Sequence, residues 1–363
     1  MNAKAAVFMG IGQPFSIREF PVTATPAGYG RSDLIASGMC GTDLHFYRGG
    51  LITTPPTVIG HEFVGKLTDC DPAEAEKYGL TIGDNVIADI AVPCGECLLC
   101  KTGDDANCVN MGVTNGGSIE EAPYLWGGYV EVNYTPLANL VKIPEGLDPT
   151  AVSVFACPGP TAMHAFRLGA QAGLDWAQIK VAVVQGAGPV GSYAAMYMKA
   201  MGVPTVYVIA KNVSPEREAL LKKLGVDEVL DLVGGSEAIT KKLQAENGGL
   251  GVDLCYEASG APNAFPQGMN ILRNRGIYLV PGQYSNSGGI EIQPQLITFK
   301  AVRIIGSSQY SMIDVKDYLA FLEKNPHLVP IVRDLATCYP VSETNKAFED
   351  ALAGKNVKTV LVK

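Results

Sequence analysis

Residues 181–191 read VAVVQGAGPVG, and this stretch decides the fold of the middle of the chain. Its first residues are typical of a buried strand, and Gly186, Gly188 and Gly191 follow with the spacing G-x-G-x-x-G before a helix expected to end near Met201. The first glycine permits a tight turn, the second lets a pyrophosphate approach the backbone and the helix N-terminus, and the third lets the helix pack against the strand. The stretch predicts dinucleotide binding, with a purely structural glycine turn as the alternative. The residues expected at the cofactor are Gly186, Gly188, Pro189, Val190 and Gly191.

The end of the next strand should indicate which nicotinamide cofactor is bound. An Asp or Glu there bonds the ribose 2′-hydroxyl of NAD, whereas a basic residue accommodates the 2′-phosphate of NADP. The position falls on Ala210, Lys211 or Asn212, and none of these is a carboxylate. Lys211, with Arg217 shortly after it, permits a phosphate contact, but both are equally well explained as solvent-exposed charges at a helix start. NAD and NADP both stay open.

The sequence pattern changes along the chain. From about Gly159, apolar strands alternate with helical segments, which predicts an α/β fold with a doubly wound parallel sheet covered on both faces. Before about residue 155, short β-branched runs between turn residues predict a β-rich region, and after Ser307 we expect one amphipathic helix and a terminal strand. The expected strands are residues 3–8, 33–36, 58–67, 85–90, 128–133, 181–185, 206–209, 252–257, 276–280, 302–305 and 359–362, and the expected helices are 189–201, 215–224 and 315–323.

Four cysteines lie close together as C-x2-C-x2-C-x7-C in the segment CGECLLCKTGDDANC. Each C-x-x-C turn presents two sulfurs to one ion, and four thiolates at such short spacings are typical of structural zinc. Disulfides and free thiols are the alternatives, and the polar loop without a preceding secretory leader argues against disulfides. We expect a structural zinc ion bound by Cys94, Cys97, Cys100 and Cys108.

A second set of possible metal ligands is spread over the first half of the chain. Cys40, His61 and Cys157 supply the three protein ligands that a catalytic zinc needs, with one position left open for water or substrate. Taken singly, each cysteine is equally well explained as a small core residue.

The composition excludes several classes of protein. The chain has 363 residues, of which 47% are hydrophobic and 18% charged, so it is long enough for two domains with a large core. Its 28 basic and 36 acidic side chains give a net charge of −8 without a basic cluster, which argues against nucleic acid or a membrane surface as partner. The opening residues show no secretory leader and no apolar run is long enough to span a bilayer, so we expect a cytoplasmic protein.

Five motifs, in this order, resemble the zinc-dependent medium-chain dehydrogenase/reductase family: CGTDLHFYRGG from Cys40, GHEFVG from Gly60, the four-cysteine lobe, GGYVEV from Gly127 and GAGPVG from Gly186. The resemblance covers essentially the whole chain. It implies a GroES-like catalytic domain over residues 1–158 with the structural zinc lobe at 94–108, a Rossmann NAD(P)-binding domain over 159–300, and a return to the catalytic domain over 301–363. It also implies that Cys40, His61 and Cys157 bind catalytic zinc, giving two zinc ions per chain.

Further roles are implied by position in these motifs. Thr42 matches the hydroxyl that relays the substrate proton, and His45 matches the imidazole at the end of that relay. Asp43 matches a carboxylate that orients the histidine ligand, and Glu62 matches an acidic neighbour of the metal. Thr161 matches a residue that packs against the nicotinamide. Helix capping is an alternative for the first threonine and the aspartate, and a surface position is an alternative for the relay histidine.

The implied activity is hydride transfer between an alcohol and NAD or NADP, because zinc lowers the pKa of the alcohol oxygen and the nicotinamide accepts the hydride. The substrate stays open. CGTDLHFY and GHEFVG resemble polyol, sugar and threonine dehydrogenases, but those relatives often have Glu or Asp in place of Cys157, which resembles the simple alcohol dehydrogenases. A secondary alcohol such as a polyol, a sugar or a hydroxy acid and a primary alcohol are all compatible.

Two rival classes share parts of this pattern. A quinone reductase has the same fold without zinc, and the ligands Cys40, His61 and Cys157 argue against it. A zinc-binding sensor of NAD(P)H redox state would have no turnover, and the relay residues Thr42 and His45 argue against it.

Assembly is suggested by an expected edge strand at residues 302–305, preceded by an expected strand at 289–293 and a glycine-rich turn at 285–289. An apolar edge favours pairing with a second copy of the chain, and the family resemblance implies the same. We therefore expect a homodimer or a homotetramer.

Overall fold

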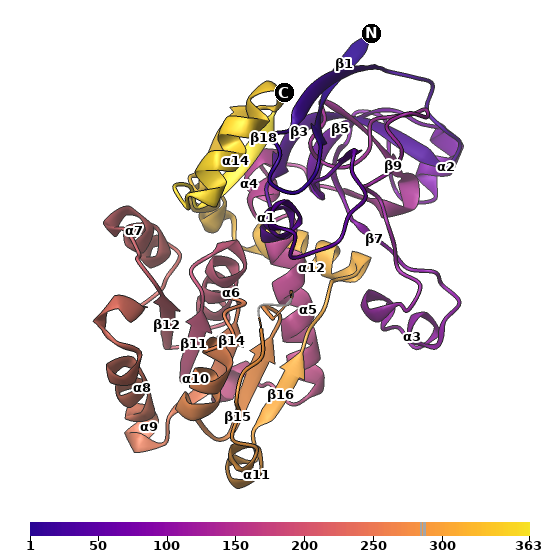
Figure 1. Cartoon of the computed structure of the whole chain (residues 1–363). Helices are drawn as coiled ribbons and strands as arrows, with labels where there is room; N and C mark the ends of the chain where they lie inside the picture. The colour runs from indigo at the N-terminus through magenta and orange to yellow at the C-terminus, as the bar shows by residue number, and fades with distance from the viewer. Residues whose placement is uncertain (284, 286–287) are drawn as a thin grey trace. The chain divides into compact units, whose positions relative to one another are not determined.

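The computed structural model describes residues 1–283, 285 and 288–363 (Figure 1). This described part of the chain divides into two compact units: residues 1–160 together with 309–363, and residues 161–308. The chain thus leaves the first unit once and returns to it.

The second unit is built on a parallel sheet. Its strands are β11 (Val181–Gln185), β12 (Thr205–Ala210), β13 (Glu228–Asp231), β14 (Val252–Glu257), β15 (Leu272–Val280) and β16 (Arg303–Gly306). Within the described residues these form a six-stranded sheet in the order β13-β12-β11-β14-β15-β16. All residues of β11 and β14 are buried, as expected of central strands covered on both faces. This is the strand order of a dinucleotide-binding sheet, in which the ligand lies beyond the carboxyl ends of the strands where the order reverses, here β11 and β14.

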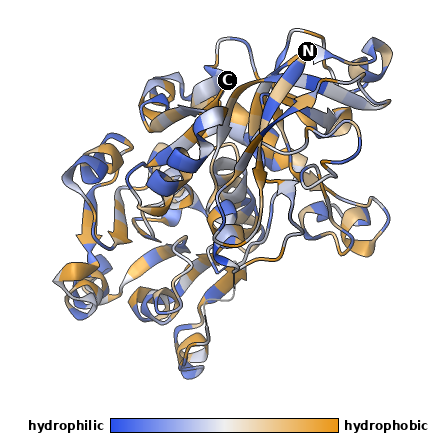
Figure 2. Ribbon diagram, turned by 45° about the horizontal axis from the view of Figure 1, so that its top comes forward, coloured by the Kyte–Doolittle hydropathy of each residue, from blue (hydrophilic) through white to orange (hydrophobic). Residues whose placement is uncertain are grey.

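Helices connect these strands, as a parallel sheet requires. The connecting helices are α6 (Pro189–Ala200), α7 (Pro215–Lys223), η4 (Leu232–Gly234), α8 (Ser236–Gln244), α9 (Glu246–Gly249), α10 (Ala264–Ile271) and α11 (Gln295–Lys300). Two further helices, α5 (Pro158–Gln171) and η3 (Trp176–Gln178), precede the first strand of the sheet. Figure 2 shows that the helices carry both hydrophobic and hydrophilic residues, as expected when one helix face packs on a core and the other meets solvent.

The first unit is β-rich. Its strands are β1 (Asn2–Phe8), β2 (Ser16–Pro21), β3 (Tyr29–Gly38), β4 (Thr57–Val58), β5 (Glu62–Asp69), β6 (Asn85–Ala88), β7 (Ala91–Val92), β8 (Gly112–Val113), β9 (Val132–Pro136), β10 (Leu140–Lys142), β17 (Ala336–Pro340) and β18 (Lys358–Val362). Its helices are α1 (Gly41–Arg48), α2 (Pro72–Glu76), α3 (Leu98–Lys101), η1 (Asp105–Asn107), η2 (Leu137–Asn139), α4 (Pro149–Val154), α12 (Met312–Lys324), η5 (Pro326–Leu328), α13 (Val329–Arg333), η6 (Val341–Glu343) and α14 (Thr344–Leu352). The main sheet runs β10-β6-β5-β3-β18-β17, with β9 also paired to β3.

The register of this sheet brings the two ends of the sequence together. Gly38 at the end of β3 pairs with Glu62 of β5 on one side and with Val360 of β18 on the other. The C-terminal strand is therefore an interior strand of the sheet of the first unit, between β3 and β17.

The fold class predicted from the sequence is confirmed, but some expected elements are wrong. Residues 289–293 are not a strand, although Ile290 and Ile292 alternate with other residues as in a strand. The segment begins at Gly289 directly after Gly288, Pro294 follows it, and the described residues offer it no partner strand. Ile292 instead lines a cavity of about 310 Å³ together with Phe265 and Met269 of α10. Tyr284, Asn286 and Ser287, in or beside the expected turn at 285–289, lie outside the described residues.

Two other expectations need correction. The strand expected at residues 128–133 lies further along the chain, in β9. Within the expected range, Val130 makes only an isolated bridge to Ala5. The segment after Ser307 holds α13, α14 and β17 in addition to the expected helix and strand. The short strand β13 was not expected, because its sequence EVLD has no apolar run.

No helix in the described part of the chain has the length and apolar character needed to cross a membrane.

Candidate active site and metal centres

Four side chains of the first unit converge as a possible metal centre. Cys40 precedes α1, His61 and Glu62 stand at the start of β5, and Cys157 directly precedes α5. One ligand atom from each lies within 4.8 Å of the ligand atoms of the other three. The Cys40 and Cys157 sulfurs are 3.8 Å apart, and two thiolates on a tetrahedral zinc with Zn–S bonds of about 2.3 Å would be separated by about 3.8 Å. The donor set and its spacing therefore fit zinc.

A buried carboxylate fixes two of these ligands. Asp43 accepts a hydrogen bond of 2.9 Å from the Cys40 backbone N–H and one of 2.8 Å from the Tyr129 hydroxyl. Its other oxygen lies 3.7 Å from His61 Nδ1. An imidazole whose Nδ1 faces a carboxylate offers its Nε2 atom to a metal. The role of Asp43 in orienting His61, expected from the motif, is thus compatible with the geometry.

The protons of the cluster depend on one another. A hydrogen bond from Cys157 holds the pKa of Cys40 well below its usual range, and the same contact, with burial, raises the pKa of Cys157. Burial is the largest single effect and lowers the pKa of His61, but the charge and hydrogen bond of Cys40 together with the charges of Asp43 and Glu62 outweigh it and raise that pKa to about 9. These side chains by themselves thus favour one thiolate next to an imidazolium. A divalent cation would displace the remaining protons, because thiolates and neutral imidazole are its ligands.

Glu62 is paired with a lysine from the other end of the chain. Glu62 and Lys358 form an ion pair in which Glu62 is fully buried and Lys358 is 1% exposed. Gly38 lies between their strands, and a Cβ atom at this position would collide with both side chains. Burial raises the pKa of Glu62 to about 8 despite the opposing effect of Lys358. The pair holds a carboxylate beside the metal cluster.

Replacing Lys358 with methionine should destabilise the protein by about 3–5 kcal/mol, because it leaves the Glu62 carboxylate buried without its partner. Chemical unfolding of the variant checks this. The double variant Lys358→Met with Glu62→Gln should recover much of the loss, since neither charge then remains. Equal stability of the single and double variants would contradict the coupling.

Helix α1 places the two expected relay residues. Thr42 is half-buried in its first turn, and its Oγ1 atom lies 3.7 Å from Cys40 Sγ. His45 follows three residues later, so the two side chains are neighbours on one helix face. The structure brings Thr42 to the metal cluster, whereas His45 is half-buried on the helix and is not one of the clustered ligands.

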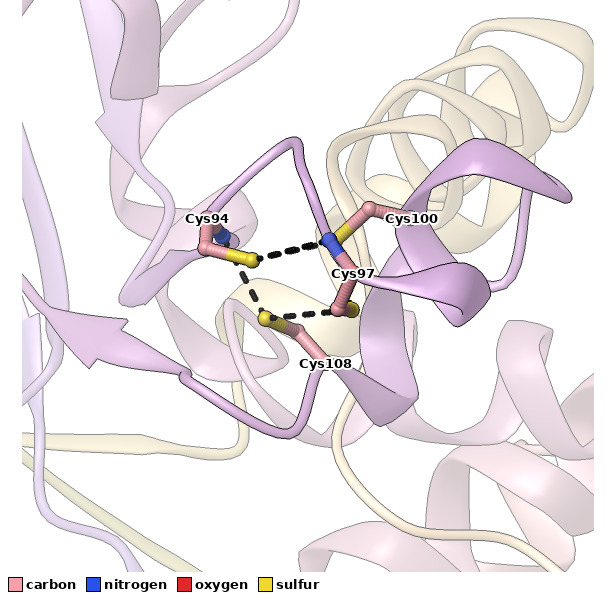
Figure 3. Close-up of side chains that lie close together, drawn as sticks. All are labelled: Cys94, Cys97, Cys100 and Cys108. Atoms are coloured by element: carbon pink, nitrogen blue, oxygen red, sulfur yellow. Dashed lines mark hydrogen bonds between the residues drawn. The ribbon is translucent and has the colours of Figure 1, made fainter.

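The four lobe cysteines converge on one point (Figure 3). The sulfur of Cys97 lies 3.5 Å from that of Cys100 and 4.0 Å from that of Cys108, and the sulfurs of Cys94 and Cys100 are 4.0 Å apart. These separations bracket the value of about 3.8 Å for thiolates on tetrahedral zinc. The lobe therefore fits the structural zinc that the spacing predicts.

Backbone N–H groups prepare the lobe for a cation. The N–H groups of Glu96 and Cys97 point at the Cys94 sulfur at 3.5 and 3.4 Å. Hydrogen bonds from the Cys100 and Val109 backbones lower the pKa of Cys97 to about 6. Such donors favour thiolates, which are the form that binds a metal.

In the second unit the glycine motif has the geometry that its spacing predicts. Gly186 has φ +110°, a left-handed conformation that suits glycine, and a Cβ atom at Gly191 would collide with the Gly186 carbonyl oxygen. Gly188 caps α6, followed by Pro189 and Val190, and a Cβ atom there would meet nothing within 4 Å. The protein itself does not require glycine at this position, so the open space above it fits a pyrophosphate approaching the helix N-terminus.

The turn after β12 contains no carboxylate of its own. Lys211 and Asn212 are exposed, and Asn212 has φ +55°. The N–H groups of Asn212 and Val213 donate to the Asp231 carboxylate at 3.2 and 3.3 Å. An acidic side chain from the neighbouring strand β13 thus accepts the backbone hydrogen bonds of this turn. Arg217 is half-buried in α7, and burial lowers its pKa.

Two residues of the metal site were not expected from the sequence. Lys358 is the first residue of the apolar strand β18, a position at which a lysine is usually solvent-exposed. Nothing in the local sequence therefore predicts its ion pair with Glu62. Tyr129 lies in the motif GGYVEV, but only the fold shows that its hydroxyl donates a hydrogen bond to Asp43.

Thr161, the residue expected to pack against the nicotinamide, is half-buried in α5 and lies in the second unit.

A dinucleotide-type sheet with its glycine turn, and a thiolate–imidazole cluster beside a hydroxyl, define a metal-dependent dehydrogenase. Comparison with known proteins agrees. The zinc-binding dehydrogenase family matches residues 189–324, and the alcohol dehydrogenase GroES-like domain family matches residues 33–145. The chain belongs to the zinc-dependent medium-chain dehydrogenase/reductase family.

The similarity to relatives extends over most of the chain. This chain is 30% identical to an alcohol dehydrogenase of Geobacillus stearothermophilus, and the alignment covers 97% of this chain and 96% of that protein. It is 30% identical to an erythritol/L-threitol dehydrogenase of Mycolicibacterium smegmatis, with 75% and 74% covered. A solved alcohol dehydrogenase structure from Thermotoga maritima has a TM-score of 0.89 and 26% identity, with 100% and 99% covered. These matches confirm the predicted class of activity, which is that of a zinc-dependent, NAD(P)-linked alcohol dehydrogenase.

Proposed function

We propose that Cys40, His61 and Cys157 hold the catalytic zinc of this alcohol dehydrogenase, and that Thr42 and His45 relay the substrate proton. The compact donor set with a hydroxyl beside it carries this proposal. We further propose that the four lobe cysteines hold a second, structural zinc.

The chain's own residues then have defined tasks. Zinc held by the three ligands supplies a Lewis acid that favours proton loss from an alcohol. The Thr42 hydroxyl can accept that proton while passing on its own, and His45 lies on the same face of α1 to receive it. Asp43 orients the His61 imidazole, and the ionised Glu62 places a negative charge beside the metal ligands.

Cofactor binding is assigned to the glycine turn. The open face above Gly188 and the N-terminus of α6 support a pyrophosphate at Gly186, Gly188, Pro189, Val190 and Gly191. Thr161 is proposed to pack against the nicotinamide, which accepts the hydride.

The test is a substrate screen of the purified, zinc-loaded protein with NAD and with NADP, read by nicotinamide absorbance. Primary alcohols, secondary alcohols, polyols, sugars and hydroxy acids form the panel, because Cys157 resembles simple alcohol dehydrogenases while the motifs around Cys40 and His61 resemble polyol enzymes. Turnover with at least one alcohol or its carbonyl product is expected. Absence of turnover across the panel by protein with full zinc content would favour a redox sensor instead.

Replacing Lys211 with alanine should raise KM for NADP by about tenfold with little change for NAD, if the exposed lysine contacts a 2′-phosphate. The effect should shrink at high salt, because the contact is electrostatic and exposed. Steady-state kinetics with both cofactors check this, with Lys223→Ala at the other end of α7 as the matched control. An equal effect on both cofactors would make Lys211 a surface charge.

A homodimer or homotetramer is proposed from the edge of the second sheet. Strand β16 pairs only with β15 among the described residues, and Ile304 at its centre is half-buried. An open strand edge can be completed by the same edge of a second copy about a two-fold axis. Ile304→Lys should therefore convert an even-numbered oligomer into monomers or aggregates in light scattering. A wild-type protein that is a stable, active monomer would contradict the proposal.

A cytoplasmic location is also proposed. Two clusters of thiols that serve as zinc ligands must stay reduced, and the cytosol keeps thiols in that state.

A further inference from the structure

Glu257 is a buried carboxylate at the cofactor end of the second unit. It is the last residue of β14, is fully buried, and lies in register with Gln185, the last residue of β11. The carboxyl ends of these two strands are where a sheet of this order binds a dinucleotide. None of the cofactor or metal contacts proposed so far involves Glu257, although a buried carboxylate is costly unless it is hydrogen-bonded.

The carboxylate holds the turn that follows β14. Its Oε1 atom accepts hydrogen bonds from the Ser259 N–H at 2.7 Å, the Ser259 hydroxyl at 2.6 Å and the Gly260 N–H at 3.0 Å. Burial raises the pKa of Glu257, and the hydrogen bonds from Ser259 and Gly260 act in the opposite direction. Hydrogen bonds to an ionised acceptor are stronger than those between neutral groups. The turn at residues 258–261 is therefore fixed by this one side chain.

The same turn lies against the glycine motif. Ala258 donates its N–H to the Gln185 carbonyl at 2.8 Å. A Cβ atom at Gly186 would lie 2.9 Å from the Ser259 nitrogen, closer than such atoms approach in proteins. The turn that Glu257 fixes therefore also limits the space beside Gly186.

Glu257 also contacts the loop that follows β15. Gly282 donates its N–H to the Glu257 carbonyl at 2.9 Å, and a Cβ atom at Gly282 would collide with Glu257 Oε2. The Gln283 amide donates to the Ala261 carbonyl at 3.1 Å, which joins this loop to the turn after β14. The Glu257 carboxylate thus lies between the two segments that follow β14 and β15.

These segments belong to one half of the cofactor site. In a sheet of this order, the two halves of a dinucleotide lie on either side of the point where the order reverses, and the adenosine ribose is bound at the end of β12. Strands β14 and β15 therefore carry the nicotinamide half. We propose that Glu257 is a positioning residue that holds residues 258–261 and 281–283 in place for the nicotinamide half of the cofactor. This inference rests on the proposed cofactor site at the glycine turn.

The test compares Glu257→Met with Glu257→Gln in the zinc-loaded protein. Methionine has a similar length but no strong acceptor, whereas the glutamine amide oxygen can still accept from the Ser259 and Gly260 N–H groups. Glu257→Met should weaken NADH binding and lower kcat by about tenfold each, because a small displacement of a reactant is costly. Binding of ADP, which lacks the nicotinamide half, should change by less than about twofold. Glu257→Gln should stay close to wild type in each measurement.

Asp253→Asn is the matched control, because Asp253 is a buried carboxylate near the opposite end of β14. It accepts the Lys180 and Val181 N–H groups, each at 2.9 Å. This variant should lower Tm and leave NADH and ADP binding unchanged, which is the pattern of a purely structural carboxylate. Glu257→Asp, one methylene shorter, decides the result if methionine prevents folding, since it keeps a carboxylate in place and should show a weaker form of the same defect.

Fluorescence of bound NADH and competition by ADP give the two affinities. NADPH and 2′-phosphorylated ADP replace these probes if the substrate screen selects NADP. The inference is overturned if folded Glu257→Met or Glu257→Asp binds NADH as tightly as wild type, if NADH and ADP affinities fall together, or if Glu257→Gln is as defective as Glu257→Met. Wild-type protein that binds neither probe would overturn the proposed cofactor site as well, so the two failures are distinguishable.

Discussion

Replacing His61 with alanine should lower kcat by about a thousandfold or more while the protein remains folded. Loss of one of three protein ligands removes the Lewis acid from the site, and such an acid contributes several kcal/mol to charge stabilisation in the transition state. Folding should survive, because Asp43 keeps its hydrogen bonds from the Cys40 N–H and the Tyr129 hydroxyl when the imidazole is removed. Zinc analysis should show a fall from two ions per chain to one.

The matched control is His327→Ala, since His327 is exposed on η5. This variant should keep its activity and both zinc ions. The experiment requires kcat, zinc content and thermal unfolding on the same preparations, because only then is lost turnover separated from lost fold. Near-normal kcat in folded His61→Ala would exclude zinc at this cluster as the Lewis acid.

The parts of this protein that could be predicted from the sequence are those in which the chemistry is local. The glycine turn at residues 186–191 joins a strand to the next helix, so its spacing fixes its geometry. The four lobe cysteines are close in sequence, and their ligand spacing is itself the signal. In both cases few conformations satisfy the residues present, and the structure has the geometry expected.

The cluster of Cys40, His61, Glu62 and Cys157 depends on contacts between distant residues, and local spacing could not establish it. Cys40 and Cys157 are 117 positions apart, so residue types alone made them possible ligands of one zinc ion, and the family resemblance was needed to favour this over two separate core cysteines. Lys358 was missed altogether, because its contact with Glu62 follows from strand β18 pairing beside β3. A lysine at the start of an apolar strand carries no local signal for a buried ion pair.

The wrong strand at residues 289–293 shows the opposite error. Alternating isoleucines satisfied the local rule for a strand, but a strand also needs a neighbouring strand to bond with. The described part of the sheet ends at β16, and the segment packs near α10 instead. Ile290 and Ile292 stay 37% and 41% exposed, because the alternating face of an extended segment is buried only when the fold places a sheet or helix against it.

Replacing Cys97 with serine should lower stability strongly while leaving the catalytic cluster intact. The lobe has little core of its own: no residue of α3 is buried, and Leu98 is 74% exposed. Its structure therefore depends on the metal, whose binding free energy contributes directly to folding. We expect a fall in Tm on the order of 10 °C and one zinc ion per chain in place of two. Proteases should cut between Cys94 and Cys108 in the variant and not in the wild type.

The control is Cys338→Ser, which removes an exposed thiol on β17 and should change neither Tm nor zinc content. The two zinc-site variants then differ in a diagnostic way, because His61→Ala should lose turnover with its fold intact and Cys97→Ser should lose stability first. At a temperature well below its Tm, Cys97→Ser should retain much of its kcat, since the catalytic ligands lie elsewhere in the unit. A Cys97→Ser protein with unchanged Tm and protease resistance would show that the lobe folds without its metal, and the four cysteines would then need another explanation.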